Sequence, residues 1–404
     1  GYFYLQNTLM RCNLSVNLYN AKKMKKIALV IIAVGSVILF FHHSCKKDTF
    51  DKNTPFYFAS EEEFKNNNQG LSDSAIIGKL IFFDTSLSEP AGVSCASCHS
   101  PMTGFSDPRH TPFSEGSTHK FGSRNANAIS YMPFAPNRRA EFIRGVWETV
   151  GGFFWDGKAE FLNQQALFPL TNPDEMNIPN FGIASAKIKH AAYYPKLQKL
   201  FGASALADSQ TIVFYAVTCL QAFQESYQVN PFTSKYDFYL KGKVKLSEQE
   251  MRGMNLFNDT TKTKCSLCHL STPTAYASTR NILFTDYSYD NIGLPKNPLQ
   301  MGMPIDSGLS KFERNNPLEV GRFKTPTLRN IEVTAPYMHS GIFSTLEEVM
   351  EFYNERDTNP KFAHPEVPAT VNKEDLGDLK LSAQEIKDII AFMKTLTDGY
   401  KLSK

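Results

Sequence analysis

A five-residue pattern, Cys-x-x-Cys-His, occurs twice in this chain. With seven Cys and nine His among 404 residues, composition alone would produce the pattern in only about three of every thousand such chains. Two occurrences therefore indicate a chemical requirement that the protein meets twice. The residues concerned are Cys95, Cys98 and His99 in the first copy and Cys265, Cys268 and His269 in the second.

Two kinds of site use cysteines paired in this way. Zinc could take the four thiolates, but it would leave both histidines without a role. In c-type haem attachment all three residues act, because the two sulfurs bond covalently to the porphyrin and the following histidine ligates the iron. The pattern therefore favours two haems, ligated by His99 and His269, over zinc.

An export segment is predicted near the start of the chain. Met24 opens a basic stretch, and the apolar run over residues 27–41 is too short for a comfortable membrane span. Cys45 then follows a small residue, as in a bacterial lipoprotein signal, although two nearby histidines fit that pattern poorly and leave a plain signal or short anchor as the alternative.

This export prediction divides the N-terminal region into three parts. We expect residues 1–23 to lie upstream of the natural start, residues 24–45 to be the signal, and residues 46–68 to be a polar tether. The functional part would then be periplasmic and held at the membrane through a lipid on Cys45. Export agrees with the haem prediction, because bacteria attach c-type haem outside the cytoplasm.

Length and charge exclude some classes of protein. A chain of 404 residues is long enough for two or more domains with proper cores. The net charge of +3 is small, and no run of Lys and Arg appears beyond the start, so nucleic acid is not an expected partner. Cys219, outside both motifs, is expected to be a small buried apolar residue.

An internal duplication underlies the two motifs. Ser72 and Ser247 each begin a stretch with helical spacing of apolar residues, and each stretch leads to one Cys-x-x-Cys-His motif in the same register. A second helix is expected to close each copy, over residues 211–226 and residues 381–396. A helix before the haem site and another at the end of the unit is the plan of cytochrome c.

The predicted fold is therefore mainly α, with two cytochrome c-like haem domains in tandem. We place them at residues 69–240 and 241–404, because residues 230–242 have the Pro, Gly and turn residues of a linker. Residues 101–153 and 276–322 show little periodicity but contain many aromatics, so we expect long ordered loops and few strands there.

Further motifs, in their order around the two haem sites, show that the chain resembles the bacterial di-haem cytochrome c peroxidases and their MauG-type relatives. The resemblance covers nearly everything from about Leu71 to Leu396. The motifs that carry it are FFDTSLS (82–88), GFSD (104–107), SRNA (123–126), FFWDGKA (153–159), FKTPTLRNIEVTAPYMHSG (323–341) and FYN (352–354).

The resemblance implies a division of labour between the haems. The N-terminal haem, on His99, would meet hydrogen peroxide, and the C-terminal haem, on His269, would pass electrons to it. Trp155 matches the tryptophan that the family places between the haems as an electron bridge. Taken alone, a tryptophan in so aromatic a motif would more simply be part of the core.

Two more matches concern proton transfer. Cleaving the O–O bond of peroxide needs an open iron position and a nearby group that takes and returns a proton. Glu175, in the stretch NPDEM, matches the family's catalytic glutamate, and Gln165 matches the amide that orients peroxide or water. Without the resemblance, Glu175 would be interpreted as a charge near the start of a helix.

The resemblance also implies a calcium ion, held by hard oxygen ligands at Asn125, Thr334 and Pro336; otherwise Asn125 is a typical turn residue. His119 lies in the loop where better-known members carry a histidine that occupies the peroxide site at rest. It is closer to Asn125 than the family spacing, so a surface histidine is the alternative.

The sixth ligand of the second haem distinguishes subgroups of the family. Counting the family distance from His339 reaches Tyr353, where MauG-type relatives also have a tyrosine, and Met350 is one helical turn earlier. A thioether stabilises reduced iron, whereas a phenolate stabilises ferric iron. Tyr353 packed in the core is the third possibility.

The leading functional prediction is an exported peroxidase that reduces hydrogen peroxide with electrons from a small c-type cytochrome or cupredoxin. A MauG-like oxidase of a protein or small molecule is the second hypothesis. A pure electron carrier is the third, and Glu175 with Gln165 argues against it, because a carrier needs no proton-handling pair.

Overall fold

The computed structural model describes residues 60–402, apart from residues 144, 276, 313–315 and 363. The predicted signal, Cys45 and most of the predicted tether lie outside the described residues. The described residues belong to one compact unit. Within the described part of the chain, no helix is both long and apolar enough to cross a membrane.

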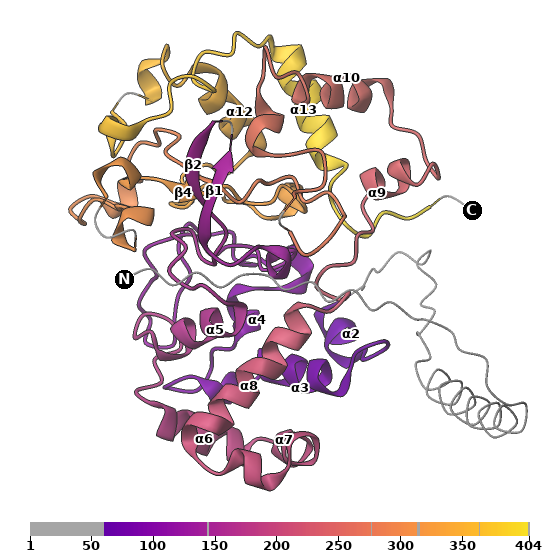
Figure 1. The fold of residues 1–404 in the computed structure, drawn as a ribbon, viewed down its shortest axis with the longest axis vertical. Helices are drawn as coiled ribbons and strands as arrows, with labels where there is room; N and C mark the ends of the chain where they lie inside the picture. The colour runs from indigo at the N-terminus through magenta and orange to yellow at the C-terminus, as the bar shows by residue number, and fades with distance from the viewer. Residues whose placement is uncertain (1–59, 144, 276, 313–315, 363, 403–404) are drawn as a thin grey trace, which may run out of the picture. The chain divides into compact units, whose positions relative to one another are not determined.

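The architecture is mainly helical (Figure 1), which confirms the predicted fold class. The α-helices are α2 (Glu61–Asn66), α3 (Asp73–Phe82), α4 (Cys95–Cys98), α5 (Leu162–Thr171), α6 (Phe181–His190), α7 (Tyr194–Phe201), α8 (Ser209–Gln224), α9 (Lys235–Leu240), α10 (Glu248–Phe257), α11 (Cys265–Cys268), α12 (Leu346–Glu355) and α13 (Ala383–Lys394).

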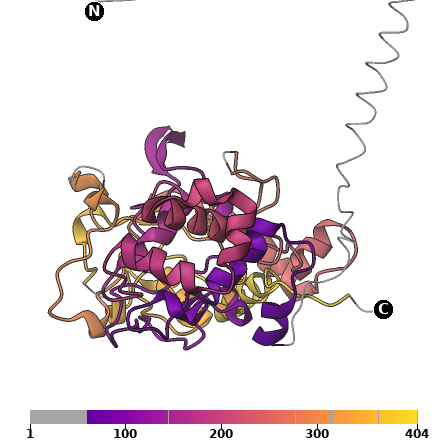
Figure 2. The ribbon, with the colours of Figure 1, turned by 90° about the horizontal axis from the view of Figure 1, so that it is seen from below.

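The described strands form two small antiparallel sheets. One is the hairpin of β1 (Arg139–Ile143) and β2 (Val146–Val150), and the other pairs β3 (Tyr289–Asp290) with β4 (Phe323–Lys324). Figure 2 shows the β1–β2 hairpin projecting from the body, and Trp147 on it is 73% exposed. The sequence pattern had indicated only loop in this region.

Both copies of the duplication form the same helix pair, α3 with α8 and α10 with α13. Gly78 and Gly253, at matching positions after the capping serines, lie at the two crossings. A Cβ on Gly78 would be 1.9 Å from the carbonyl oxygen of Cys219, and one on Gly253 would be 1.8 Å from that of Asp388. Only glycine therefore allows each pair to approach so closely.

Local sequence explains where these helices begin. Ser72 accepts a hydrogen bond from the N–H of Ala75 at 3.2 Å, and Ser247 forms a capping box with Glu250, so each cap satisfies N–H groups that the helix leaves free. The closing helices α8 and α13 begin and end within two residues of the predicted bounds.

Two segments differ from the sequence-based expectations. Helix α2 lies inside the predicted tether, because Phe64 on it packs in the core at 1% exposure. Helix α9 lies inside the predicted linker, where Asp237 accepts hydrogen bonds of 2.9 and 3.0 Å from the buried Arg329. Tertiary partners outweigh the polar composition of α2 and the turn residues that flank α9.

The hydrophobic core has parts within each half and one part between them. The last cluster contains Tyr131, Phe153 and Leu162 from the first half and Leu283 and Tyr287 from the second. Segments of the two halves thus pack against each other in this cluster, which contains residues from 131–162 of the first half and from 283–287 of the second. The division into domains at residue 240 stays a prediction.

Candidate functional site

Each Cys-x-x-Cys segment is one helical turn, α4 or α11, and the histidine ends it. The backbone N–H of His99 donates to the carbonyl of Cys95 at 3.0 Å, and that of His269 donates to Cys265 at 2.9 Å. Residues three and four apart lie on the same side of a helix, so this turn presents two thiols and an imidazole to one cavity.

The imidazoles are held in the orientation that metal ligation requires. Nδ1 of His99 lies 3.1 Å from the carbonyl oxygen of Phe105, and Nδ1 of His269 lies 3.0 Å from that of Phe284. Because Nδ1 donates in this arrangement, Nε2 carries the free lone pair. Burial lowers the pKa of both histidines, which favours the neutral ring that binds iron.

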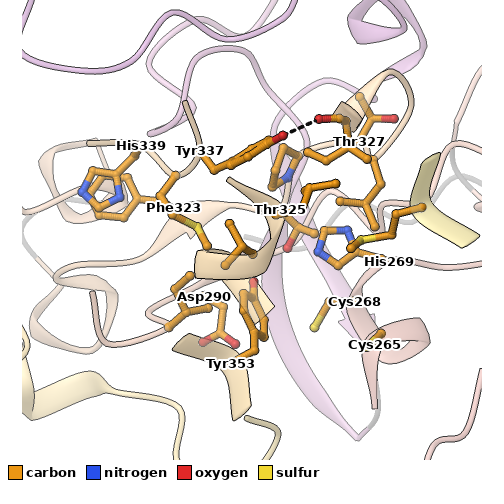
Figure 3. Close-up of a pocket in the computed structure, with 18 of the residues that line it drawn as sticks. Cys265, Cys268, His269, Asp290, Phe323, Thr325, Thr327, Tyr337, His339 and Tyr353 are labelled. Carbon is orange, nitrogen blue, oxygen red and sulfur yellow. Dashed lines mark hydrogen bonds between the residues drawn. The ribbon is translucent and has the colours of Figure 1, made fainter. Parts of the chain in front are cut away.

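Each motif faces its own cavity. The N-terminal cavity, with Cys95, Cys98 and His99 in its lining, has a volume of about 440 Å³. The C-terminal cavity, lined by Cys265, Cys268 and His269, has a volume of about 210 Å³ (Figure 3). A thiol pair plus an oriented imidazole at the wall of a largely apolar cavity fits a covalently attached haem in each half.

The zinc alternative does not fit this geometry. The two thiol pairs lie in separate cavities, and no group of three or more His, Cys, Asp and Glu side chains in the described chain could hold a metal ion. Burial also raises the pKa of Cys95 to about 12 and that of Cys265 to about 11, which disfavours the thiolates that zinc needs.

Trp155 lies in the wall between the cavities and lines both of them. Its indole Nε1–H donates to the carbonyl oxygen of Asn125 at 2.9 Å, and its own carbonyl accepts from the backbone N–H of Lys324 at 2.8 Å. The ring is therefore fixed by contacts to both halves of the chain, where a bridge between two cofactors would have to be.

The N-terminal cavity also receives the predicted proton-handling pair. Gln165 on α5 and Glu175, in the turn after that helix, both line it with His99. Burial raises the pKa of Glu175, against a hydrogen bond of 2.7 Å from Asn172 and the positive charge of Lys158. A poorly solvated carboxyl group with a raised pKa in a cavity is typical of an acid–base residue.

The turn that carries Glu175 is held by the loop of residues 114–121. The N–H of Ser117 donates to the Glu175 carbonyl at 2.7 Å, and the hydroxyl of Thr118 donates to Pro173 at 3.1 Å. A Cβ on Gly116 would be 2.2 Å from the carbonyl oxygen of Asp174, so only glycine lets this loop pack so closely against the turn.

His119 lies in this same loop but points away from the cavity. Its side chain is 89% exposed and pairs with Glu115 at 2.7 Å. It is not among the residues that line the N-terminal cavity. The structure therefore shows the His119 side chain at the surface, and its role as a haem ligand stays a prediction.

The C-terminal cavity differs in its remaining walls. Tyr353 and Met350, both on α12, line it together with His269, and Figure 3 shows Tyr353 and His269 pointing into the same space. Burial raises the pKa of Tyr353, and the nearby Cys268 adds to this effect. Tyr353 is then a neutral phenol unless a cation stabilises its anion.

His339 lies in this cavity without an obvious ligand role. Its ring stacks on Phe323 at a centroid distance of 3.5 Å and meets Trp155 edge-on at 6.5 Å. Burial lowers its pKa to about 3, so the imidazole is neutral. Its carbonyl accepts the N–H of Asn125 at 2.8 Å, which joins it to the wall between the cavities.

The three predicted calcium positions lie on the wall of one cavity. Asn125, Thr334 and Pro336 all line the C-terminal cavity. Among the described residues, no hydrogen bond is donated to Oδ1 of Asn125 or to the carbonyl oxygens of Thr334 and Pro336. Three free oxygens fit a hard cation such as calcium.

Comparison with known proteins agrees with this geometry. Residues 72–245 match the family model of di-haem cytochrome c peroxidase. The methylamine utilization protein MauG of Paracoccus denitrificans is 34% identical over 351 residues, which cover 80% of this chain and 88% of that protein. The chain belongs to the di-haem cytochrome c peroxidase and MauG family. Two c-type haems follow from this membership.

Other relatives carry both names of the family. The cytochrome c551 peroxidase of Nitrosomonas europaea is 30% identical over 328 residues, covering 81% of this chain and 80% of that protein. The crystal structure of the diheme peroxidase BthA from Burkholderia thailandensis has a TM-score of 0.72 and 32% identity, covering 80% of this chain and 86% of that one. The fold is therefore that of a diheme peroxidase.

Sequence reasoning missed two features of the site. Lys158, in the FFWDGKA motif, lines the N-terminal cavity with Glu175. Arg124 joins the halves by donating to Asp156 at 2.6 Å and to Asp306 at 2.7 and 2.8 Å. Both are charged residues inside motifs that carry the family resemblance, and this was the available signal, since such charges are rarely buried without a partner or a role.

Proposed function

We propose that this protein is an exported peroxidase that reduces hydrogen peroxide to water with electrons from a small redox protein. The observation that carries the proposal is the position of Glu175: this half-buried carboxyl group lines the same cavity as Gln165 and His99. Membership of a family that includes cytochrome c peroxidases supports the same reaction.

The chain's residues have distinct tasks in this reaction. When bound, haem supplies the iron at which the O–O bond breaks and the store of electrons for it. Glu175 takes the proton from the near oxygen of peroxide and returns it to the far oxygen, while Gln165 orients the molecule. Overall, one peroxide takes up two electrons and two protons and yields two waters. Trp155 offers the route for electrons from the C-terminal half.

Export and calcium complete the proposal. We infer a periplasmic protein, tethered through a lipid on Cys45, because covalent haem attachment requires export and the N-terminal sequence has a signal-like pattern. Calcium at Asn125, Thr334 and Pro336 would fix the loops around the wall that holds Trp155, since Asn125 accepts the indole N–H.

A MauG-like oxidase is the second candidate, favoured by Tyr353. A tyrosine, rather than only a methionine, faces His269 across the C-terminal cavity, and a phenolate ligand would stabilise ferric iron. An enzyme of that kind would use peroxide to oxidise a protein or small molecule instead of drawing electrons from a donor. In a turnover assay of such an oxidase, the electrons for peroxide would come from this substrate instead of from a reduced cytochrome.

The decisive experiment is steady-state peroxide turnover by the haem-loaded protein with a reduced c-type cytochrome. We expect Glu175→Gln to keep both haem spectra and to lower kcat by a factor on the order of 10² or more, as for loss of an acid–base group. Asp174→Asn is the control: this neighbour is 46% exposed and lies 3.9 Å from Lys120, so turnover should stay within about threefold. Equal activity of wild type and Glu175→Gln would refute the assigned role.

A further inference from the structure

Lys158 is a half-buried cation that lines the N-terminal cavity with the groups that would handle peroxide. It lines this cavity together with Gln165 and Glu175. Its ammonium nitrogen lies 4.0 Å from the ring centroid of Phe154 and 5.0 Å from that of Phe168. These distances are typical of cation–π contacts, which hold a cation without neutralising it.

Both aromatic rings that contact the Lys158 ammonium belong to segments that also carry proposed functional residues. Phe154 precedes Trp155 in the chain, and Phe168 lies one turn beyond Gln165 on α5. The rings themselves meet edge-on at a centroid distance of 5.6 Å. Lys158 is therefore fixed by the same two elements that position the bridging tryptophan and the orienting amide.

The other cations that line the cavity are already paired. Arg124 donates to Asp156 and Asp306, and Lys311 lies 3.7 Å from Asp306. For Lys158, no carboxylate oxygen of the described residues lies within 4.0 Å of the ammonium. Lys158 is thus the lining cation whose charge is left to act on its surroundings.

The electrostatics of Lys158 and Glu175 are reciprocal. Burial lowers the pKa of Lys158, and the charges of Asp156 and Glu175 raise it. Burial raises the pKa of Glu175, and the charge of Lys158 lowers it. Each group therefore favours the charged form of the other, as expected for opposite charges in one poorly solvated cavity.

We propose that Lys158 is a positioning residue for peroxide cleavage: its ammonium keeps Glu175 ionised, ready to accept the proton of bound peroxide. The inference rests on the proposed function, because it assigns Lys158 a role through Glu175. A neutral carboxylic acid could not take that proton, and burial alone would favour the neutral acid. Lys158 opposes this effect without forming an ion pair that would occupy the carboxylate oxygens.

The remaining charges around Glu175 are accounted for by other contacts. Glu115 pairs with the exposed His119 at 2.7 Å, and Asp174 lies 3.9 Å from Lys120. Asp156 accepts from Arg124 at 2.6 Å. Asp174 raises the pKa of Glu175, so it acts against Lys158. His99, the remaining titratable ring in this cavity, is kept neutral by burial.

The test compares Lys158→Met, which removes the charge, with Lys158→Arg, which keeps it. In the haem-loaded protein, kcat/KM for peroxide should rise with pH as Glu175 ionises. Loss of the cation should move the midpoint of this rise upward by at least about half a pH unit, which lowers kcat/KM below the midpoint by about threefold. Lys158→Arg should keep the wild-type midpoint.

A second readout does not depend on turnover. The C=O stretch of protonated Glu175, identified by its loss in Glu175→Gln, should disappear at higher pH in Lys158→Met than in wild type. Lys158→Gln serves as another neutral variant if the methionine variant folds poorly. An unchanged midpoint in the neutral variants, or the same shift in Lys158→Arg, would overturn the inference.

The two proposals fail in different ways. If Glu175→Gln loses turnover while the neutral variants at Lys158 keep the wild-type midpoint, only the role of Lys158 is refuted. If Glu175→Gln turns over peroxide like wild type, the proposed function of Glu175 is refuted first.

Discussion

The two cavities share the side that carries the histidine and differ in their other walls. In both, a single helical turn presents the thiols, and the carbonyl of a phenylalanine with left-handed backbone geometry, Phe105 or Phe284, orients the ring. The N-terminal cavity then receives Glu175, whereas the C-terminal cavity receives Tyr353. The duplicated part carries the residues for haem attachment, and the proposed functions assign the difference in chemistry to the residues that are not duplicated.

The difference suggests how one motif can serve two tasks. A carboxyl group beside an open iron position supports proton transfer to a small substrate. A phenol or thioether that closes the sixth position leaves iron able to pass electrons but not to bind peroxide. Trp155 lines both cavities. Electrons from the C-terminal haem would therefore pass through the wall that holds it to the cavity in which peroxide is cleaved.

The largest effect is expected from removing one haem at a time. The intact mass of the exported wild-type protein should exceed that of the chain by two haem units, and each double variant, Cys95→Ala with Cys98→Ala or Cys265→Ala with Cys268→Ala, should lose one. Both should lose donor-driven turnover. Only the second should still react with stoichiometric peroxide, because it keeps the cavity with Glu175. A wild-type mass with one haem would contradict the two-site interpretation.

The next largest effect is expected on the reduction potential of the second haem, from residues of α12 that line the C-terminal cavity. If Tyr353 ligates the second haem, Tyr353→Phe should raise its reduction potential by on the order of 0.1 V, a modest part of the roughly 0.8 V that axial ligands span. Met350→Leu should leave it unchanged. Magnetic circular dichroism of the ferric protein checks the assignment: a near-infrared band typical of His/Met iron, lost in Met350→Leu and kept in Tyr353→Phe, would refute ligation by tyrosine.

A smaller effect is expected where the loop of residues 114–121 holds the turn with Glu175. A Cβ on Gly116 would overlap the carbonyl oxygens of Asp174 and Glu175, at 2.2 and 2.6 Å. Gly116→Ala should therefore displace Glu175 and lower kcat between about 10- and 100-fold, with both haem spectra retained. Gly122→Ala is the matched control directly after this loop, since its nearest contact would be 3.8 Å. Equal turnover of the two variants would exclude a positioning role for Gly116.

The smallest effect on turnover is expected from a position at which the two copies differ. Lys79 on α3 donates to the carbonyls of Phe64 and Asn67 and to Gln228, whereas α10 has Met254 there. Lys79→Met should leave kcat unchanged but lower the free energy of unfolding by about 1–3 kcal/mol, because buried acceptors lose their donor.

Denaturant unfolding of the haem-loaded protein measures this loss. Met254→Leu is the control in the second copy, and it should cost less than about 1.5 kcal/mol because it conserves side-chain volume and removes no hydrogen bond. A similar stability of wild type and Lys79→Met would show that water replaces the ammonium at no cost.

Much of the fold could be predicted from periodicity and capping. Ser72 and Ser247 begin the helices that lead to each motif, and α8 and α13 close the copies close to the expected bounds. Helices α2 and α9 could not be predicted, because both are short and depend on tertiary partners for Phe64 and Asp237. The β1–β2 hairpin was also missed, since its strands bury little apolar surface and carry no alternating pattern.

The candidate site was predictable where chemistry fixes spacing. The thiols and histidine of a haem motif must follow one another within one helical turn, so Cys95, Cys98 and His99 could be identified without a structure. Glu175 depended on a resemblance, because one carboxylate in a turn carries no local signature. His119 was ambiguous from sequence, and the structure adds that its side chain is exposed and paired with Glu115.

The sequence by itself determined that this protein carries two haem motifs, on two copies of a helical unit, because covalent attachment and helix capping are local and leave their residues at fixed spacings. Only the tertiary structure decided that Glu175 and Lys158 share a cavity with His99, that Tyr353 shares one with His269, and that Trp155 lies in the wall between them. These residues are brought together by long loops whose paths depend on packing between the halves, and such packing leaves no regular pattern in the chain.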